Sequence, residues 1–287
     1  MSAMTEIVPL PTTAKQAPTA RVTDLHAPPA RLPTITTPRF TIVAPMLNEA
    51  AAVEPMARAI ASACAALAPF EAIFVNDGST DATAECIAAL RAEFPWLREV
   101  RHARPCGQSA AVRSGVLAAR APIVCTIDGD NQNPPEEIPR LVRPLLDGTN
   151  PRLGLVAGQR RARQDSASKR LASRAANALR ARLLHDDTRD SGCGLKAFPR
   201  EVFLALPFFD HLHRYLPALV RREGYEIERI DVGHRARETG VSKYTNLGRA
   251  LVGVTDLFGV WWLLHRRRRP EIVHQDPASP GERPPSP

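Results

Sequence analysis

The chain has 287 residues, of which 44% are apolar and 24% are charged, and this composition excludes disorder throughout. Its 38 Lys and Arg against 30 Asp and Glu give a net charge of +8, which favours phosphate-rich partners without choosing among nucleic acid, anionic lipid and nucleotide-like substrates. The five cysteines are odd in number and form no C-x-x-C pair, so we predict neither a disulfide framework nor a structural zinc site, and a reducing cytosol fits best.

Prolines gather at both ends of the chain. Seven of the 27 prolines fall in residues 1–38 and six fall in residues 270–287, and such segments cannot bury a core. We therefore expect disordered tails over these two ranges. The N-terminus has no apolar run after a basic start, and charges interrupt the best candidate span, 247–264, so we predict no cleaved signal and no spanning helix.

Short apolar runs alternate with helical patterns from Phe40 onward. Strands are predicted at 40–44, 72–75, 97–101 and 123–127, and helices at 53–67, 84–90 and about 108–119. This order implies an α/β fold with a mostly parallel, doubly wound sheet, whose ligand site lies at the carboxyl ends of the strands. The segments after about 150 are interpreted as helical and basic. The glycine fingerprints of dinucleotide sites and P-loops are absent.

Polar loops follow three of the predicted strands. They read P-M-L-N-E at 45–49, N-D-G-S-T-D at 76–81 and D-G-D-N-Q-N-P-P-E at 128–136. Singly, each also suits a turn or a helix cap, whereas together they favour one cleft. The pair Asp128 and Asp130 can hold a hard divalent cation that also bridges two phosphates, which predicts Mg²⁺ or Mn²⁺ with a nucleoside diphosphate.

Through these three motifs, in this order, the sequence resembles family 2 glycosyltransferases with the A-type nucleotide-sugar fold. Further motifs narrow the resemblance to the polyprenyl-phosphate (dolichol-phosphate mannosyltransferase-like) enzymes, and they lie at Gly158–Arg160, Lys169–Ser173, Asp190–Phe198 and Arg237–Tyr244. The resemblance covers about residues 39–265. It implies an inverting, metal-dependent transfer of a sugar from a nucleotide-sugar, such as GDP-mannose or a UDP-sugar, to a polyprenyl (undecaprenyl-type) phosphate.

The resemblance also implies a role for each matching residue on the donor side. The base and ribose pocket would be lined by Pro45, Leu47, Glu49, Val75 and Asp77. Asp128 and Gly129 would lie beside the ribose and diphosphate, and Asp130 and Gln132 would meet the metal. Further donor contacts would come from Arg160, Arg237 and Lys243. The residues expected to be catalytic are Asp128, Asp130 and Arg237.

The acceptor side would use the basic segment. Between 152 and 183, nine basic residues stand against one acid, Asp165. By resemblance, the acceptor phosphate would meet Arg160, Lys169 or Arg170, and Ser173, and the choice between 169 and 170 stays open. A solvated basic helix explains Arg161, Arg163, Arg180 and Arg182. A phosphate monoester is largely dianionic at neutral pH because its second pKa is about 6, so such an acceptor needs no catalytic base.

The last helical pattern, 247–269, ends in two tryptophans and four arginines. An apolar, tryptophan-tipped face beside cations suits an anionic lipid surface, and core packing or a partner interface remain alternatives. We therefore expect a catalytic domain over 39–246 and a membrane-surface segment over 247–269. The protein would then act in the cytoplasm, peripherally on the inner face of the cytoplasmic membrane.

Two rival functions follow from the same sequence. A same-fold enzyme that elongates a glycan would need a carboxylate base near the acceptor. A nucleic-acid-binding protein would use the basic segments, but the chain has only 5% aromatic residues and no recognition motif, so we predict no nucleic-acid partner. The sugar and the nucleotide base are not readable from the sequence.

Overall fold

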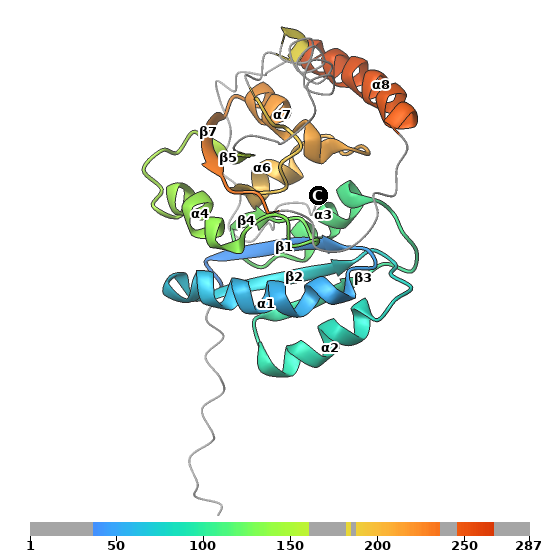
Figure 1. Cartoon of the computed structure of the whole chain (residues 1–287). Coiled ribbons are helices and arrows are strands. Elements are labelled where there is room, and N and C mark those ends of the chain that lie inside the picture. The colour runs from blue at the N-terminus through green and yellow to red at the C-terminus, as the bar shows by residue number, and fades with distance from the viewer. Residues whose placement is uncertain (1–36, 161–181, 185–187, 236–245, 267–287) are drawn as a thin grey trace, which may run out of the picture. The chain divides into compact units, whose positions relative to one another are not determined.

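The computed structural model describes residues 37–160, 182–184, 188–235 and 246–266. Within these ranges, one sheet carries helices on both faces (Figure 1). Its strands are β1 (Phe40–Met46), β2 (Phe70–Asn76), β3 (Leu97–Arg101), β4 (Ile123–Thr126), β5 (Leu153–Arg160), β6 (Lys196–Pro199) and β7 (Glu226–Val232). The α-helices are α1 (Ala50–Cys64), α2 (Thr83–Glu93), α3 (Gln108–Ala118), α4 (Ile138–Leu146), α6 (Arg200–Leu204), α7 (Leu216–Arg222) and α8 (Asn246–His265). Short 3-10 helices are η1 (Ala65–Leu67), η2 (Pro135–Glu137) and η3 (Leu212–Arg214).

The seven strands lie in the order β3-β2-β1-β4-β6-β5-β7. All neighbouring pairs are parallel except those of β6, which runs antiparallel to both β4 and β5. The predicted mostly parallel α/β sheet is thus confirmed. Because Lys196 opens β6 opposite Thr126 of β4 and Ala157 of β5, the start of β6 lies at the edge where β4 and β5 end.

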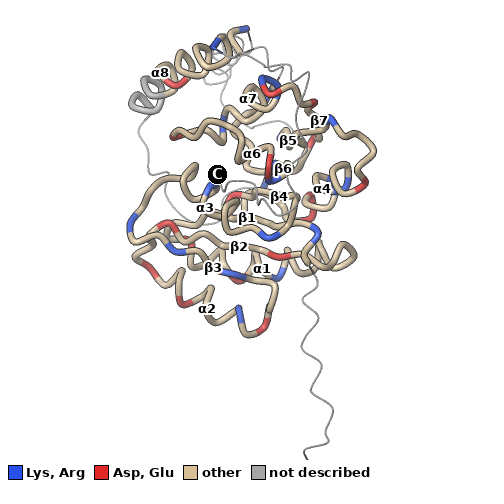
Figure 2. Tube along the Cα trace, turned by 180° about the vertical axis from the view of Figure 1, so that it is seen from behind, with Lys and Arg blue, Asp and Glu red and all other residues tan. Residues whose placement is uncertain are grey.

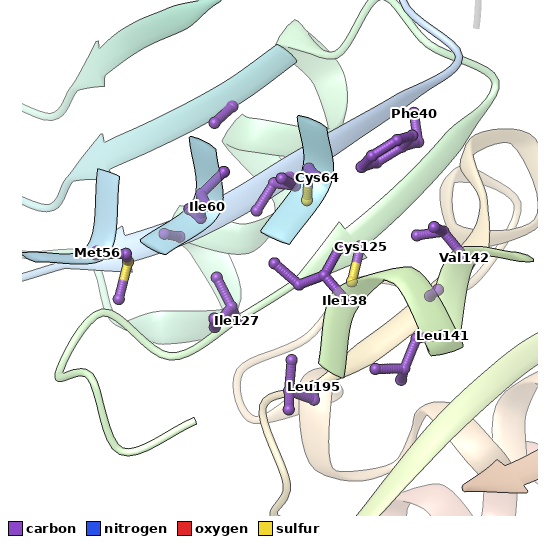
Figure 3. Packing of buried hydrophobic residues seen from close by; sticks show 14 of the residues in the cluster. Phe40, Met56, Ile60, Cys64, Cys125, Ile127, Ile138, Leu141, Val142 and Leu195 are labelled. Atoms are coloured by element: carbon purple, nitrogen blue, oxygen red, sulfur yellow. The ribbon is translucent and has the colours of Figure 1, made fainter. Parts of the chain in front are cut away.

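Successive side chains of the central strands point to opposite faces of the sheet, where they form two apolar layers. Ile42 and Phe74 point into the layer formed with α1, α2 and α4, which Figure 3 shows at close range. Val43 and Val75 point into the layer formed with α3, α6 and α7. All four side chains have no exposed surface, as expected of a sheet that is covered on both faces. This packing holds the strand ends, and the loops that follow them, in fixed positions.

Helix α1 and the turn after it need separate mention because they are strongly apolar. Among the described helices, only Ala50–Leu67 combines the length and hydropathy of a membrane span. Met56 and Ile60 of this helix are fully buried in the layer against the sheet. We therefore interpret it as a core helix.

Three strands lie in the part of the chain that we expected to be helical. This part does contain α6, α7 and α8, but β5, β6 and β7 complete the sheet. The run at β5 is buried along almost its whole length, whereas β7 is a partly exposed edge strand. The predicted tails, 1–38 and 270–287, lie almost wholly outside the described residues, as does the helix expected to begin near Ala167.

Candidate active site

The three polar motifs leave β1, β2 and β4 at one edge of the sheet. The register pairs Met46 with Asn76 and Val43 with Thr126, so the strands end at neighbouring positions. Parallel strands bring the loops after their carboxyl ends together. The amide of Asp77 donates to the carbonyl of Met46 at 2.8 Å, which joins the first two loops at their bases.

The loops of the first two motifs are joined by hydrogen bonds, in which backbone amides of one loop donate to side-chain oxygens of the other. The amide of Asn48 donates to Ser79 Oγ at 3.0 Å, and Asn48 Oδ1 accepts from the amide of Thr80 at 2.7 Å. The amide of Glu49 donates to Thr83 Oγ1 at 3.0 Å. Asn48 adopts a left-handed φ of 55°, a conformation that asparagine tolerates better than most residues. Several motif residues therefore serve to fix the two loops to one another.

Asp77 anchors the segment between β3 and α3. Its carboxylate accepts hydrogen bonds from the amides of Cys106 and Gly107, both at 2.8 Å, and lies 2.7 Å from His102 Nδ1. The residue is only 3% exposed. We predicted that Asp77 would line the base and ribose pocket, which stays a prediction. In the structure its carboxylate also holds the segment that contains His102, Cys106 and Gly107.

Asp128 is held by a carboxamide on each of its two oxygens. Gln108 Nε2 donates to Oδ1 and Asn133 Nδ2 donates to Oδ2, each at 2.8 Å. Burial and the nearby charge of Asp130 raise the pKa of Asp128. A carboxylate in this position gains from a cation beside it, because a cation offsets both causes.

Asp130 and Gln132 lie on the same turn, where Asn131 has a φ of 59°. Both residues are partly exposed, and Asp130 Oδ1 accepts from the amide of Gln132 at 3.2 Å. Within the described residues, Oδ1 of Asn133 is buried and accepts no hydrogen bond. Carboxylate and carboxamide oxygens are the ligands that Mg²⁺ and Mn²⁺ prefer, so the side chains at this turn fit such an ion.

The segment that enters β6 packs directly on Asp128. A Cβ on Gly194 would lie 2.3 to 2.4 Å from the carboxylate atoms of Asp128, so only glycine permits this approach. The carbonyl of Gly194 also accepts from Thr126 Oγ1 at 2.7 Å. The glycine-rich motif at 190–198 therefore forms part of the wall around the Asp128 carboxylate.

Lys196 is a site residue to which we assigned no role from the sequence. It is 2% exposed, and its ammonium donates to the carbonyls of Ser191 (3.2 Å) and Cys193. Burial lowers its pKa, while the charges of Cys193, Asp128 and Asp190 act in the opposite direction. The signal in the sequence was a lysine that interrupts the apolar run Leu195–Phe198, since a buried lysine requires partners of this kind.

Arg160 lies at the same edge, paired with Asp190. Its Nε and Nη2 donate to the two carboxylate oxygens at 2.5 and 2.8 Å, and both side chains are largely buried. Burial alone would raise the pKa of Asp190, but the hydrogen bond and charge of Arg160 outweigh it and lower the pKa. The predicted phosphate contact of Arg160 therefore starts from an arginine that already has a carboxylate partner.

The other predicted residues differ in their exposure and in whether they lie in the described ranges. Pro45, Leu47 and Glu49 are partly exposed on the first loop, and Gly129 packs on it, since a Cβ there would lie 2.3 Å from the carbonyl oxygen of Pro45. Val75 has no exposed surface, so its side chain belongs to the core and we withdraw it from the base pocket. The predicted residues that lie outside the described ranges are Lys169, Arg170, Ser173, Arg237 and Lys243.

Replacing Gly194 with alanine is expected to lower kcat by about 100-fold, because the added methyl group must displace the carboxylate of Asp128. Steady-state kinetics of the purified variant will measure the effect. Gly192→Ala is the matched control, since its Cβ would meet Arg160 Nη2 at 3.5 Å, an ordinary contact. Equal activities for the two variants would show that the position of Asp128 is unimportant for turnover.

Solved structures share this fold. The chain superposes on the crystal structure of glucosyl-3-phosphoglycerate synthase from Mycobacterium tuberculosis in complex with phosphoglyceric acid, with a TM-score of 0.57 and 23% identity over 79% of this chain and 80% of that one. A complex of the same enzyme with Mn²⁺, UDP and phosphoglyceric acid gives a TM-score of 0.59 over 81% and 80%. The chain therefore has the fold of this enzyme, an α/β fold whose acidic loops lie at one edge of the sheet.

The sequence comparisons identify the family. The family model for glycosyl transferase family 2 matches residues 41–206, and the chain belongs to this family. It is 34% identical to a dodecaprenyl-phosphate galacturonate synthase of Rhizobium johnstonii over 80% of this chain and 69% of that protein. It is also 34% identical to an undecaprenyl-phosphate 4-deoxy-4-formamido-L-arabinose transferase of Aeromonas hydrophila subsp. hydrophila, over 71% and 62%. The chain thus spans about two thirds of the length of these relatives.

Proposed function

We propose that this glycosyltransferase moves a sugar, with inversion, from a nucleotide-sugar to a polyprenyl phosphate of the undecaprenyl type, and that it requires Mg²⁺ or Mn²⁺. The observation that carries the proposal is the meeting of opposite charges at one edge of the sheet. Asp128 and Asp130 stand on one loop, and Arg160 and Lys196 lie close enough to Asp128 to act on its pKa. The names of the two relatives, both for polyprenyl-phosphate acceptors, support the acceptor class.

The donor would be held by the acidic loop together with the metal. Asp130 and Gln132 would hold the ion, and Asp128 would lie beside the ribose and diphosphate. The ion, when bound, supplies positive charge to the diphosphate of the donor and to the nucleoside diphosphate that leaves. Because bare carboxylates repel a diphosphate, we expect donor binding to depend on the metal.

The acceptor would supply its own nucleophile. A polyprenyl phosphate is largely dianionic at neutral pH, so one of its oxygens can attack the anomeric carbon without a general base. The attack forms the new oxygen–carbon bond as the bond to the nucleoside diphosphate breaks. Lys169 or Arg170, with Ser173, would position the phosphate, and Arg237 and Lys243 would contact the donor diphosphate. Arg160 would have to share or exchange Asp190 to contact either phosphate.

The acceptor test separates this function from its same-fold rival. With Mn²⁺ and a nucleotide-sugar donor, we expect a glycosylated lipid from polyprenyl phosphate and none from the dephosphorylated polyprenol. Transfer to the alcohol at a comparable rate would indicate an enzyme that provides a carboxylate base. The donor can be chosen beforehand by thermal shift, because a ligand at 100 times its Kd should stabilise the fold by about 2.7 kcal/mol.

Helix α8 would bring the enzyme to the inner face of the cytoplasmic membrane. Val254, Phe258, Trp261 and Trp262 are 39 to 60% exposed along its described part, which is almost entirely free of charged residues in Figure 2. The sequence continues with four arginines, Arg266–Arg269. An apolar face beside such a cluster suits anionic lipid, where each basic residue adds about 1 kcal/mol of binding.

Replacing both tryptophans of α8, Trp261→Ser with Trp262→Ser, is expected to weaken binding to anionic vesicles by about 10-fold or more. Sedimentation with phosphatidylglycerol-containing liposomes measures this. Leu117→Ser is the matched control, because Leu117 is 53% exposed but lies on α3. If the double variant sediments with the liposomes as the natural chain does, the exposed face of α8 is not the membrane-binding surface.

A further inference from the structure

Asp77, His102 and Cys106 bring three different metal-binding groups together beside the candidate active site. Asp77 follows β2, His102 follows β3, and Cys106 lies just before α3. A carboxylate oxygen, an imidazole nitrogen and the thiol sulfur all lie within 4.8 Å of one another. The segment 102–107 is held in place by Asp77, because the backbone amides of Cys106 and Gly107 donate hydrogen bonds to its carboxylate. The three groups are thus fixed by contacts other than a metal.

The chemistry of this set differs from that of the acidic turn at Asp130. One carboxylate, one imidazole and one thiolate form a ligand set typical of Zn²⁺, whereas Mg²⁺ prefers oxygen atoms alone. Asp77 is buried, His102 is partly exposed and Cys106 is exposed. A metal could therefore enter from the solvent side and keep one position for water, as three-ligand zinc sites do.

The contacts of His102 suit such a site. Its Nδ1 lies 2.7 Å from Asp77 Oδ1, and its Nε2 lies 2.9 Å from Ser114 Oγ. Without metal, Nδ1–H can donate to the carboxylate while Nε2 accepts from the serine hydroxyl. With metal at Nδ1, the ring proton moves to Nε2 and donates to the same hydroxyl oxygen. Ser114 can thus orient the ring in both states, as outer partners of metal-binding histidines commonly do.

We propose that Asp77, His102 and Cys106 form a binding site for Zn²⁺ or a similar thiophilic divalent ion. The ion would bind the thiolate form of Cys106, so the metal takes the place of the thiol proton. To admit the ion, His102 must withdraw slightly from Asp77, since two ligands of one zinc ion stand farther apart than the present 2.7 Å.

Occupancy would also weaken donor binding, an effect that rests on the proposed function. Cys106 stands two residues before Gln108, whose side chain holds Asp128 at 2.8 Å. A metal that draws the 102–106 segment toward itself would pull on the first residue of α3 and so on this contact. The metal would thus reduce activity at a site separate from the one that activates the enzyme.

Titration of the full chain with Co²⁺, in excess Mg²⁺, tests the site without an activity measurement. We expect a thiolate-to-cobalt absorption band in the near ultraviolet that saturates at one ion per chain and disappears when Zn²⁺ is added. Cys106→Ser should abolish the band, and His102→Gln should weaken Co²⁺ binding about 10-fold or more. Cys86→Ser, at a partly exposed thiol on α2, should keep it. A missing band in the natural chain, or one that persists in Cys106→Ser, would overturn the site.

The functional effect needs its own measurement. In the sugar-transfer assay with saturating Mg²⁺, about one equivalent of Zn²⁺ should raise the donor KM of the natural chain several-fold and leave that of Cys106→Ser unchanged. Equal inhibition of both proteins would overturn the link to donor binding while the cobalt band still decides the site. If the natural chain transfers no sugar even when no zinc is added, the proposed function is contradicted, and the cobalt band still decides the metal site.

Discussion

Replacing Asp130 with alanine is expected to abolish sugar transfer, with kcat lowered by about 100-fold or more at saturating Mn²⁺. The side chain is partly exposed on the turn that follows β4, where its Oδ1 accepts a hydrogen bond from the amide of Gln132 at 3.2 Å. A metal can therefore reach this carboxylate from solvent, whereas the nearby carboxylate of Asp128 is held by Gln108 and Asn133. The loss should appear in turnover with polyprenyl phosphate and in direct Mn²⁺ binding, measured by electron paramagnetic resonance.

Asp147→Ala provides the control for this variant. Asp147 is an exposed aspartate at the end of α4, so its removal deletes the same chemical group from the surface and should leave the rate unchanged. Circular dichroism will establish that both variants fold. Near-normal turnover of Asp130→Ala in Mn²⁺ or Mg²⁺ would refute the metal assignment.

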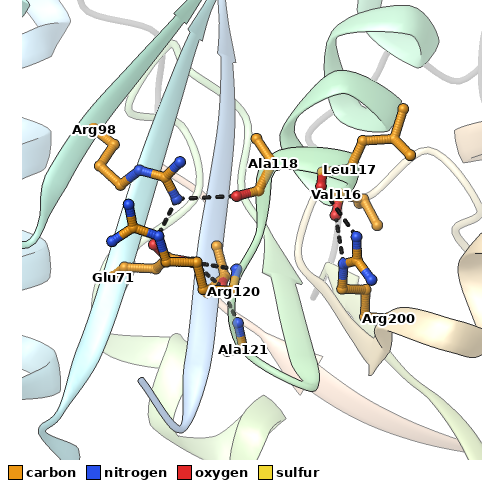
Figure 4. Close-up of polar contacts among 9 residues, drawn as sticks. Glu71, Arg98, Val116, Leu117, Ala118, Arg120, Ala121 and Arg200 are labelled. Atoms are coloured by element: carbon orange, nitrogen blue, oxygen red, sulfur yellow. Dashed lines mark hydrogen bonds and ion pairs between the residues drawn. The ribbon is translucent and has the colours of Figure 1, made fainter. Parts of the chain in front are cut away.

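Removing the buried carboxylate of Glu71 is expected to cause a large loss of stability. Glu71 is 5% exposed and accepts a hydrogen bond from Thr41 Oγ1 at 2.8 Å. Its other two donors, Arg98 Nη1 (2.8 Å) and the amide of Arg120 (2.6 Å), are shown in Figure 4. Arg98 Nη1 also donates to the carbonyl of Ala118 at the end of α3. Glu71→Ala should lower the free energy of unfolding by about 3 kcal/mol, because Arg98 and the amide lose a buried partner.

Urea denaturation of Glu71→Ala beside Glu54→Ala will measure this difference. Glu54 pairs with Arg58 on α1, where both side chains are more than half exposed, so its loss should cost less than about 1 kcal/mol. Glu71 lies near the start of β2, at the opposite end of the strand from Asp77. We therefore expect normal kcat in the folded fraction of the variant. A free energy of unfolding within 1 kcal/mol of the natural chain would contradict the role assigned to this network.

The first half of the fold could be predicted because its information is local. Strands β1, β2 and β4 read as short apolar runs, and a polar motif follows each of them directly, so position in the chain predicts position at the sheet edge. The strand predicted at 97–101 matches β3, and the helix predicted at about 108–119 matches α3 within one residue. The positions of Asp128 and Asp130 at the edge of the sheet follow from the same pattern.

Other features of the fold and the site depend on contacts between distant segments, in both halves of the chain. The four-residue strand β6 begins with a lysine and becomes a strand only by pairing with both β4 and β5. The anchoring role of Asp77 depends on Cys106 and Gly107, about 30 residues away. The close packing of α3 on the sheet depends on Gly115, because a Cβ there would lie 2.4 Å from Val43 and 3.1 Å from Val75. Residue spacing and composition do not show which distant residues will be in contact. The roles of these residues are therefore visible only in the folded structure.

The reversed direction of β6 affects how much the connection between β5 and β6 can vary. Strand β5 leaves the sheet at Arg160 and β6 returns at Lys196 on the same rim, and the Arg160–Asp190 pair fastens the two ends of the intervening stretch together. Because both ends of this connection lie on one rim, a change in its length would leave the pairing of β5 and β6, and the acidic loop after β4, where they are.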